Sequence, residues 1–468
     1  MVQVKKNMEK AFWLLLTLSP ALDIINGIWA YLLSGGKGGM LSSLNIKDLP
    51  TLSPSLTVRL VFLVMMTVYV FLLKKKRSIL MFVAIGGTWV LTVGYEILRG
   101  VEFSFMADLQ YIVRFCYCLL VLVAYSAMLK EDGRSQAEIK AAVDKVLCLS
   151  LLVLGIGVLL PYLLGMGFYT YADPLGYRGS RGFFYAGNDI TAVMMLVLPV
   201  VLAGWMEQKN WKKPGYGWIQ ALACAFCFDS MLIIGTKTAF LAAGVTAAAM
   251  GGYALVRALT KKQWDMLVRL VIVAVLALAM MVLLTLGTAL VQDIKASLAK
   301  EDAPRPVAPN QSGSPLDTIK DSISATNKYN ETAGAETVIF SGRTGKLKAV
   351  LTQLKEAMPL SLLVGIGRGS QQRIIEMDLF EVVFYYGILG SITMLWLYLT
   401  QGVKVILDLF RNFSLYNLAV CVALGLCVGF LALAGHTLFS VTGGFYFAFM
   451  IVYARLFCSR EGMKAEIL

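Results

Sequence analysis

The sequence predicts an all-α integral membrane protein with about twelve transmembrane helices, and two observations lead to this fold class. Of the 468 residues, 58% are hydrophobic and only 15% are charged, whereas an ordinary soluble domain carries about 25% charged residues. The chain also contains about twelve apolar stretches close to the roughly 20 residues that a helix needs to cross the hydrocarbon layer. They lie at about 11–33, 56–73, 78–98, 107–129, 146–166, 188–205, 216–235, 238–256, 266–291, 380–402, 414–434 and 437–457.

The distribution of positive charge predicts that both termini lie in the cytoplasm. Lys and Arg near the ends of spans favour the cytoplasmic side, and every second short loop is basic, for example Lys74–Arg77. The basic leader is not followed by a small-residue cleavage site, so we expect the first span to be retained. The pattern requires an even number of spans and places the one long hydrophilic insert on the extracytoplasmic side.

The insert divides the chain into three parts: helices 1–9 at 1–291, an extracytoplasmic loop at 292–379, and helices 10–12 at 380–468. The first half of the loop is a flexible linker rich in Pro, Gly and Ser. In the second half, apolar residues recur at helical spacing: Leu347, Val350, Leu351, Leu354 and Met358. This spacing predicts a short amphipathic helix near 345–358 that lies on the membrane face or covers a cavity.

The eight cysteines do not predict a metal or redox site. They lie in or at the ends of predicted spans, and the one C-x-x-C, Cys224 with Cys227, sits within an apolar helix without histidine partners. We interpret them as small apolar packing residues.

Cations on the extracytoplasmic side are informative because the positive-inside rule disfavours them there. Five are arginines near glycines: Arg178, Arg181, Arg343, Arg368 and Arg373. Asn188 shares a loop with Arg178 and Arg181. Lys237, between two spans, is a further outward cation. Because a guanidinium presents a planar fork of donors that matches phosphate oxygens, the set predicts a pyrophosphate held at the outer face. The alternative is that these side chains extend to lipid headgroups or pair with nearby acids.

Three acids mark the start of the tenth span: Glu376, Asp378 and Glu381. If the helix begins there, Asp378 and Glu381 lie on one face at i, i+3. One reading is catalytic, with a carboxylate accepting a proton from an attacking hydroxyl. The other is favourable negative charge at a helix N-terminus. A metal site built from the same acids would rest on a lone E-x-D pattern, which is weak support.

His436 is the only histidine in the chain and lies in a tight outward turn between the last two predicted spans. It is either a hydrogen-bonded polar group of that turn or a proton-transfer residue at the outer cavity.

Four stretches together resemble the superfamily of O-antigen ligases and polysaccharide polymerases of bacterial envelopes. They are R-G-F-F-Y-A-G-N-D at 181–189, G-T-K-T-A at 235–239, S-G-R at 341–343 followed by G-I-G at 365–367, and E-M-D at 376–378 leading to Y-G-I-L-G at 386–390. Lysine replaces the usual arginine in the second stretch. The resemblance covers roughly residues 175–450.

The resemblance implies a multi-span glycosyltransferase of the bacterial inner or plasma membrane whose active site faces outside. It implies a donor oligosaccharide on undecaprenyl pyrophosphate, with no nucleotide sugar, cofactor or metal. Other polysaccharide-assembly proteins, such as a flippase or a chain-length regulator, are the expected partners, and nucleic acid is not. Lipopolysaccharide ligases typically carry a His-Asn pair where this chain has Glu376 and Asp378, so we expect a polymerase of a capsule, exopolysaccharide or O-antigen.

In the expected reaction, an acceptor sugar hydroxyl attacks the anomeric carbon of the pyrophosphate-linked chain. Glu376 or Asp378 accepts the proton, with Glu381 and His436 beside them, and the outward cations stabilise the leaving pyrophosphate. Three alternatives remain: ligase-like transfer of a finished glycan to an acceptor, a polysaccharide or lipid transporter without chemistry, and a sugar-binding or cell-division scaffold such as a relative of the peptidoglycan polymerases that span the membrane.

Overall fold

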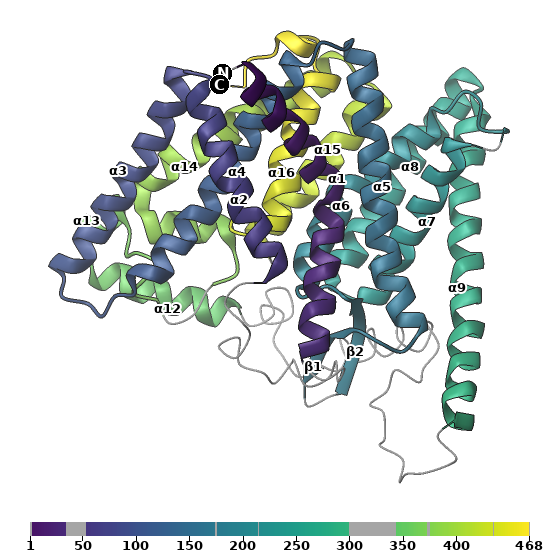
Figure 1. Ribbon diagram of the computed structural model, residues 1–468, viewed down its shortest axis with the longest axis horizontal. Coiled ribbons are helices and arrows are strands. Elements are labelled where there is room, and N and C mark those ends of the chain that lie inside the picture. The colour runs from purple at the N-terminus through teal and green to yellow at the C-terminus, as the bar shows by residue number, and fades with distance from the viewer. Residues whose placement is uncertain are drawn as a thin grey trace. The chain divides into compact units, whose positions relative to one another are not determined.

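The computed structural model describes residues 2–33, 53–173, 176–213, 215–298, 343–371, 375–433 and 435–467. Within these ranges, twelve helices are long and apolar enough to cross a membrane, which confirms the predicted all-α multi-span class (Figure 1). They are α1 (Val2–Leu33), α2 (Pro54–Leu72), α3 (Lys76–Leu98), α4 (Phe105–Glu131), α5 (Gln136–Leu163), α6 (Gly187–Met206), α7 (Tyr216–Ile234), α8 (Lys237–Lys261), α9 (Trp264–Leu298), α14 (Asp378–Arg411), α15 (Leu415–Leu433) and α16 (Val441–Tyr453), which a π-helical turn, η4 (Ala454–Cys458), continues.

The remaining described elements are short. An antiparallel hairpin, β1 (Phe168–Asp173) and β2 (Gly176–Gly182), precedes α6. Two helices, α12 (Arg343–Glu356) and α13 (Leu360–Val364), precede α14, and a 3₁₀ turn, η5 (Gly462–Lys464), follows η4. The predicted amphipathic helix near 345–358 is therefore confirmed as α12, whereas the predicted linker before it lies outside the described residues.

The chain forms two compact units. Unit 1 contains the described residues of Met1–Phe12, Val61–Lys140 and Tyr329–Leu468, and unit 2 those of Trp13–Leu60 and Ala141–Lys328. Each unit is discontinuous in sequence, because α1, α2 and α5 each contribute residues to both.

In unit 1, α4 packs along α16, and α14 packs against α3 and α15. The helix α14 breaks at Gly387, whose φ of 65° lies in the left-handed region and which has no room for a side chain beside Leu363. A break of this kind leaves carbonyl groups of the preceding turn without helical partners. The loop after α13 supplies the missing donors: the Ile366 and Gly367 amides donate to the Phe384 and Tyr385 carbonyls, each at 3.0 Å.

The start of α1 and the C-terminal segment lie at the same end of unit 1, near the top of Figure 1. Both contact the end of α4, since Lys5 forms an ion pair with Glu131 and Lys130 donates to the Ala465 carbonyl. This arrangement agrees with an even number of spans. Asp108, in the first turn of α4, lies at the opposite end of that helix.

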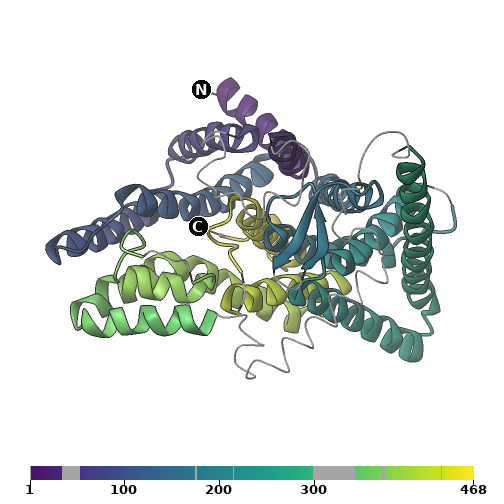
Figure 2. The ribbon, with the colours of Figure 1, turned by 90° about the horizontal axis from the view of Figure 1, so that it is seen from below.

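In unit 2, α7 packs against α6, α9 and the hairpin. The two strands run side by side (Figure 2), with Tyr169 opposite Ser180. Gly182 ends the hairpin with a φ of 59° and has no room for a side chain against Gly157 and Val158 of α5. Asp23 of α1 and Arg59 of α2 form an ion pair at 2.7 Å, which lets two charged groups be accommodated among apolar helices.

Candidate active site

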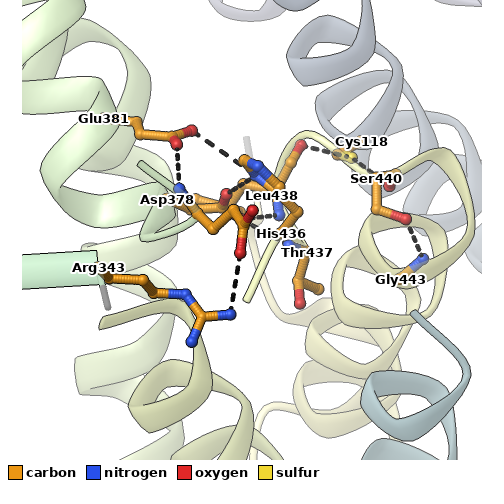
Figure 3. A network of polar contacts seen from close by, with 10 residues as sticks. Cys118, Arg343, Asp378, Glu381, His436, Thr437, Leu438, Ser440 and Gly443 are labelled. Atoms are coloured by element: carbon orange, nitrogen blue, oxygen red, sulfur yellow. Dashed lines mark hydrogen bonds and ion pairs between the residues drawn. The ribbon is translucent and has the colours of Figure 1, made fainter. Parts of the chain in front are cut away.

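The centre of the candidate site is a cluster of Asp378, Glu381 and His436 in unit 1 (Figure 3). Asp378 and Glu381 lie in the first turn of α14 and are both fully buried, so the predicted i, i+3 arrangement is confirmed. His436 comes from the turn between α15 and α16. Its Nδ1 lies 2.8 Å from Asp378 Oδ1 and 3.6 Å from Glu381 Oε2.

The carboxylate of Asp378 fixes both the ring and the backbone of this turn. Its Oδ2 accepts hydrogen bonds from the Thr437 and Leu438 amides, each at 2.6 Å. Asp378 is therefore surrounded by donors, and an ionised carboxylate is an acceptor only. The imidazole satisfies it by carrying its proton on Nδ1, which leaves Nε2 with a lone pair that can accept a proton.

The turn that carries His436 is also fixed on its other side. Ser440 caps α16, because its Oγ accepts from the Gly443 amide at 3.1 Å. The Cys118 thiol donates to the Leu438 carbonyl at 3.3 Å, and the ring of Phe439 stacks on Tyr111 with centroids 3.8 Å apart. Local sequence thus forms the cap, while α4 holds the turn in place.

Glu376 occupies a different environment from the two buried acids. Its backbone amide donates to Glu381 Oε1 at 2.7 Å, and its φ of 67° is in the left-handed region, which is uncommon for a residue with a side chain. Its carboxylate receives Arg343 on one oxygen and Lys346 on the other, each at 3.0 Å. Burial raises the pKa of Glu376, but the hydrogen bond from Lys346 and the charge of Arg343 outweigh that effect and hold its pKa below the ordinary value.

Both cations come from the first turn of α12. Contacts further along the chain hold this helix in place. Val350 and Leu354 are buried. The Tyr95 hydroxyl donates to the Ala357 carbonyl at 2.7 Å, and the Ser361 hydroxyl donates to the Leu354 carbonyl at 3.1 Å. Lys346 was not among the site residues predicted from sequence. Its spacing of three from Arg343, on a helix, was the signal that could have found it.

Arg368 lies in a glycine-containing loop beside this cluster. Its amide donates to Asp108 Oδ1 at 3.4 Å, and its guanidinium lies 6.0 Å from the ring of Tyr111. Asp108 is fully buried and also accepts from the Tyr386 hydroxyl at 3.1 Å. Tyr111 is the residue that stacks on Phe439, so the loop and the His436 turn contact the same face of α4. Sequence reasoning missed Asp108 because a lone acid at the start of a helix is ordinary.

Of the other predicted binding residues, four belong to unit 2 and one lies outside the described residues. Arg178 and Arg181 lie in β2, Asn188 is the second residue of α6 and Lys237 is the first residue of α8, all in unit 2. Arg181 is half-buried with its guanidinium 5.6 Å from the ring of Phe168, and Lys237 is exposed. Arg373 lies outside the described residues.

The donor set of Asp378, Glu381 and His436 also bears on metal binding. Their ligand atoms lie within 4.8 Å of one another, close enough to hold a metal ion. Both oxygens of Asp378, however, already accept hydrogen bonds from N–H donors. Asp378 is therefore already engaged by three hydrogen bonds from within this chain.

A sequence profile described as "O-antigen ligase like membrane protein" matches residues 5–458. A search of curated proteins found no match.

Proposed function

Because this chain belongs to the O-antigen ligase-like membrane protein family, we propose that it is a membrane glycosyltransferase. Its donor would be an oligosaccharide on a polyprenyl pyrophosphate such as undecaprenyl pyrophosphate. Its product would be a longer surface polysaccharide, made by joining repeat units.

The observation that carries this proposal is the His436–Asp378 pair. A hydroxyl is a weak nucleophile unless a positioned base accepts its proton. Asp378 holds the His436 ring by Nδ1, so Nε2 is the group that takes the proton of the acceptor sugar. As the ring becomes charged, Asp378 and the Glu381 carboxylate, 3.6 Å from Nδ1, stabilise the imidazolium.

We assign the base to His436 rather than to the two acids considered from sequence. Glu376 is engaged by two cations and has a lowered pKa, which makes it a weak base. Asp378 is engaged by three donors.

The bond changes are those of a glycosyl transfer. The acceptor oxygen forms a bond to the anomeric carbon of the donor, and the bond between that carbon and the pyrophosphate oxygen breaks. The electron pair leaves with the polyprenyl pyrophosphate, while the acceptor proton goes to His436. Arg343 and Arg368 stabilise the charge that develops on the pyrophosphate, and no metal is needed for any of these steps.

An active site that faces outside the cell is part of the proposal. The cluster lies near the start of α14, with Asp108 at the opposite end of α4 from the chain termini. If the basic loops place the termini in the cytoplasm, the site faces the other side, where lipid-linked repeat units would be joined.

The second candidate is ligase-like transfer of a finished glycan to a separate acceptor, and the description of the family favours it. The polymerase is preferred because Glu376 and Asp378 stand where ligases typically carry a His-Asn pair.

The test uses the full-length protein in lipid nanodiscs with a polyprenyl-pyrophosphate oligosaccharide from its host, and it reads products by gel and mass spectrometry. A ladder of repeat units that is lost in His436→Gln and kept in Lys348→Gln, an exposed position on α12, supports the polymerase. A single transfer that needs an added acceptor supports the ligase. Absence of any product with the verified native donor overturns the proposal and favours the transporter.

A further inference from the structure

The first turn of α12 presents two cations to one carboxylate. Arg343 and Lys346 lie three residues apart, and each reaches a different oxygen of Glu376 at 3.0 Å. The Arg343 side chain is 11% exposed and that of Lys346 is 32% exposed. The pair is thus arranged around a planar group with two acceptor oxygens, and both cations pair with the same acid.

A helix N-terminus is an unfavourable place for cations, because the helix dipole is positive there. Two basic side chains in the first turn of α12 therefore raise the local positive potential instead of cancelling it. Such a site favours an anion with several oxygens, and a diphosphate offers more acceptors and more charge than one carboxylate.

The backbone of Glu376 shows that this acid is held in a costly position. A φ of 67° lies in the left-handed region, which is strained for a residue with a side chain. The hydrogen bond from its amide to Glu381 keeps the backbone there, so the backbone stays tied to the reactive cluster whether or not the carboxylate is paired. Its side chain is 39% exposed, which leaves it room to turn away.

We propose that Glu376 is an internal counter-ion that occupies the diphosphate-binding position of Arg343 and Lys346, and that the diphosphate of a lipid-linked donor displaces it. Lys346 is thereby a second donor-binding cation on α12. This inference rests on the proposed function, since the diphosphate belongs to the glycosyl donor. It assigns Glu376 a role opposite to that of a base: it competes with the substrate.

The two roles predict different results for Glu376→Gln. If Glu376 is a base, its replacement by an amide lowers the turnover of the protein. A counter-ion replaced by an amide releases two cations, so a diphosphate binds more tightly. Binding is measured without turnover, and the outcome is therefore independent of whether the chain proves to be a polymerase, a ligase or neither.

The experiment measures binding of geranylgeranyl diphosphate to the full-length protein in nanodiscs of neutral phosphatidylcholine. We expect Glu376→Gln to tighten binding by about five- to tenfold, the scale of a modest coupling between two ligands of one site. Lys346→Gln should weaken binding in the otherwise unchanged protein. The gain from Glu376→Gln should shrink when it is combined with Lys346→Gln, because the released cation is then missing.

Two control variants on α12 remove one acidic and one basic side chain, the same kinds of charge that Glu376→Gln and Lys346→Gln remove. Glu356→Gln and Lys348→Gln are exposed positions of α12 and should leave binding within about twofold, as expected for screened surface charges. Unfolding temperatures of all variants verify that the fold is kept. Should Glu376→Gln fail to fold, Glu376→Gly, which removes both the charge and the strained φ, makes the same comparison.

Three results would overturn the proposal. They are unchanged or weaker binding in Glu376→Gln, an equal gain in Glu356→Gln, and loss of the gain when phosphatidylglycerol replaces phosphatidylcholine. The last result would assign Arg343 and Lys346 to lipid headgroups. Competition by inorganic pyrophosphate, but not by inorganic phosphate, is the expected specificity.

Discussion

The imidazole of His436 and the carboxylate of Asp378, separated by 58 positions in the chain, meet at 2.8 Å between Nδ1 and Oδ1. In Asp378→Asn the amide would present either an oxygen or an NH₂ group to the ring, so the tautomer with the proton on Nδ1 is no longer enforced. We expect a loss of turnover of roughly 10²–10⁴-fold. Single-turnover rates with the lipid-linked donor measure this loss.

The pair should behave as one unit. If Asp378 acts only through His436, the double variant Asp378→Asn with His436→Gln will be no slower than His436→Gln alone. Multiplied losses would show instead that the two residues have separate roles.

Asp108 Oδ1 accepts from the amide of Arg368 and so holds the loop that carries this arginine, while the Tyr386 hydroxyl of α14 donates to the same oxygen. Asp108→Asn should loosen this loop and raise the donor KM more than it lowers kcat, with kcat/KM falling about tenfold for one weakened buried hydrogen bond. Steady-state kinetics with varied donor separate the two constants. Glu102→Gln, an exposed acid just before α4, is the matched control, and equal effects of both changes would exclude the positioning role.

The ion pairs of Glu376 with Arg343 and Lys346 should make the contact between α12 and the segment just before α14 depend on pH. Its folded-state pKa lies below the ordinary value, so the ion pairs with Arg343 and Lys346 stabilise the folded state at neutral pH. That stabilisation is lost as the pH falls through the lowered pKa. The protection factors of the α12 amides, which correct for the intrinsic pH dependence of hydrogen exchange, should therefore fall on acidification below about pH 4, the ordinary range of a glutamate, and Glu376→Gln should show the lower protection already at pH 7. The same acid-dependent loss of protection in the Gln variant would place the titrating group elsewhere.

Gly387 should tolerate no side chain, because its φ is positive and the Leu363 carbonyl oxygen lies only 2.5 Å from where a Cβ would be. Gly387→Ala is expected to destabilise the protein by about 1–3 kcal/mol, seen as a lower unfolding temperature. Gly402→Ala, in the regular part of α14 with open space around it, should be neutral or slightly stabilising.

Metal removal is a second, independent test of the proposal that His436 accepts the proton. Chelation with EDTA should leave turnover unchanged, since His436 accepts the proton directly. Loss of activity that Mg²⁺ or Mn²⁺ restores would assign Asp378, Glu381 and His436 to a metal site.

Periodicity and length predicted most of the fold. The twelve spans, the helix α12 and the i, i+3 pair at the start of α14 depend on local sequence, and all three are confirmed. The break at Gly387 was not predicted, because its cause is the approach of Leu363 rather than anything within the apolar run.

The site was predictable as a set of residues but not as an arrangement. Sequence placed Glu376, Asp378, Glu381, His436 and Arg343 among the candidates, and the structure brings them together. From sequence, Glu376 or Asp378 was the favoured base, whereas the proposal favours His436, because sequence could not show that Glu376 is paired with Lys346 or that Asp378 is paired with His436. Such partners depend on long-range packing, which no local pattern encodes.

The hydrogen bonds across the break in α14 have a consequence for how this span is held in the membrane. Carbonyl groups of Phe384 and Tyr385 left unpaired in hydrocarbon would cost several kcal/mol each, and their donors come from Ile366 and Gly367, earlier in the chain. The stability of this span in the membrane and the position of the loop that carries Arg368 are therefore coupled, and displacing the loop leaves the broken turn of α14 unsatisfied.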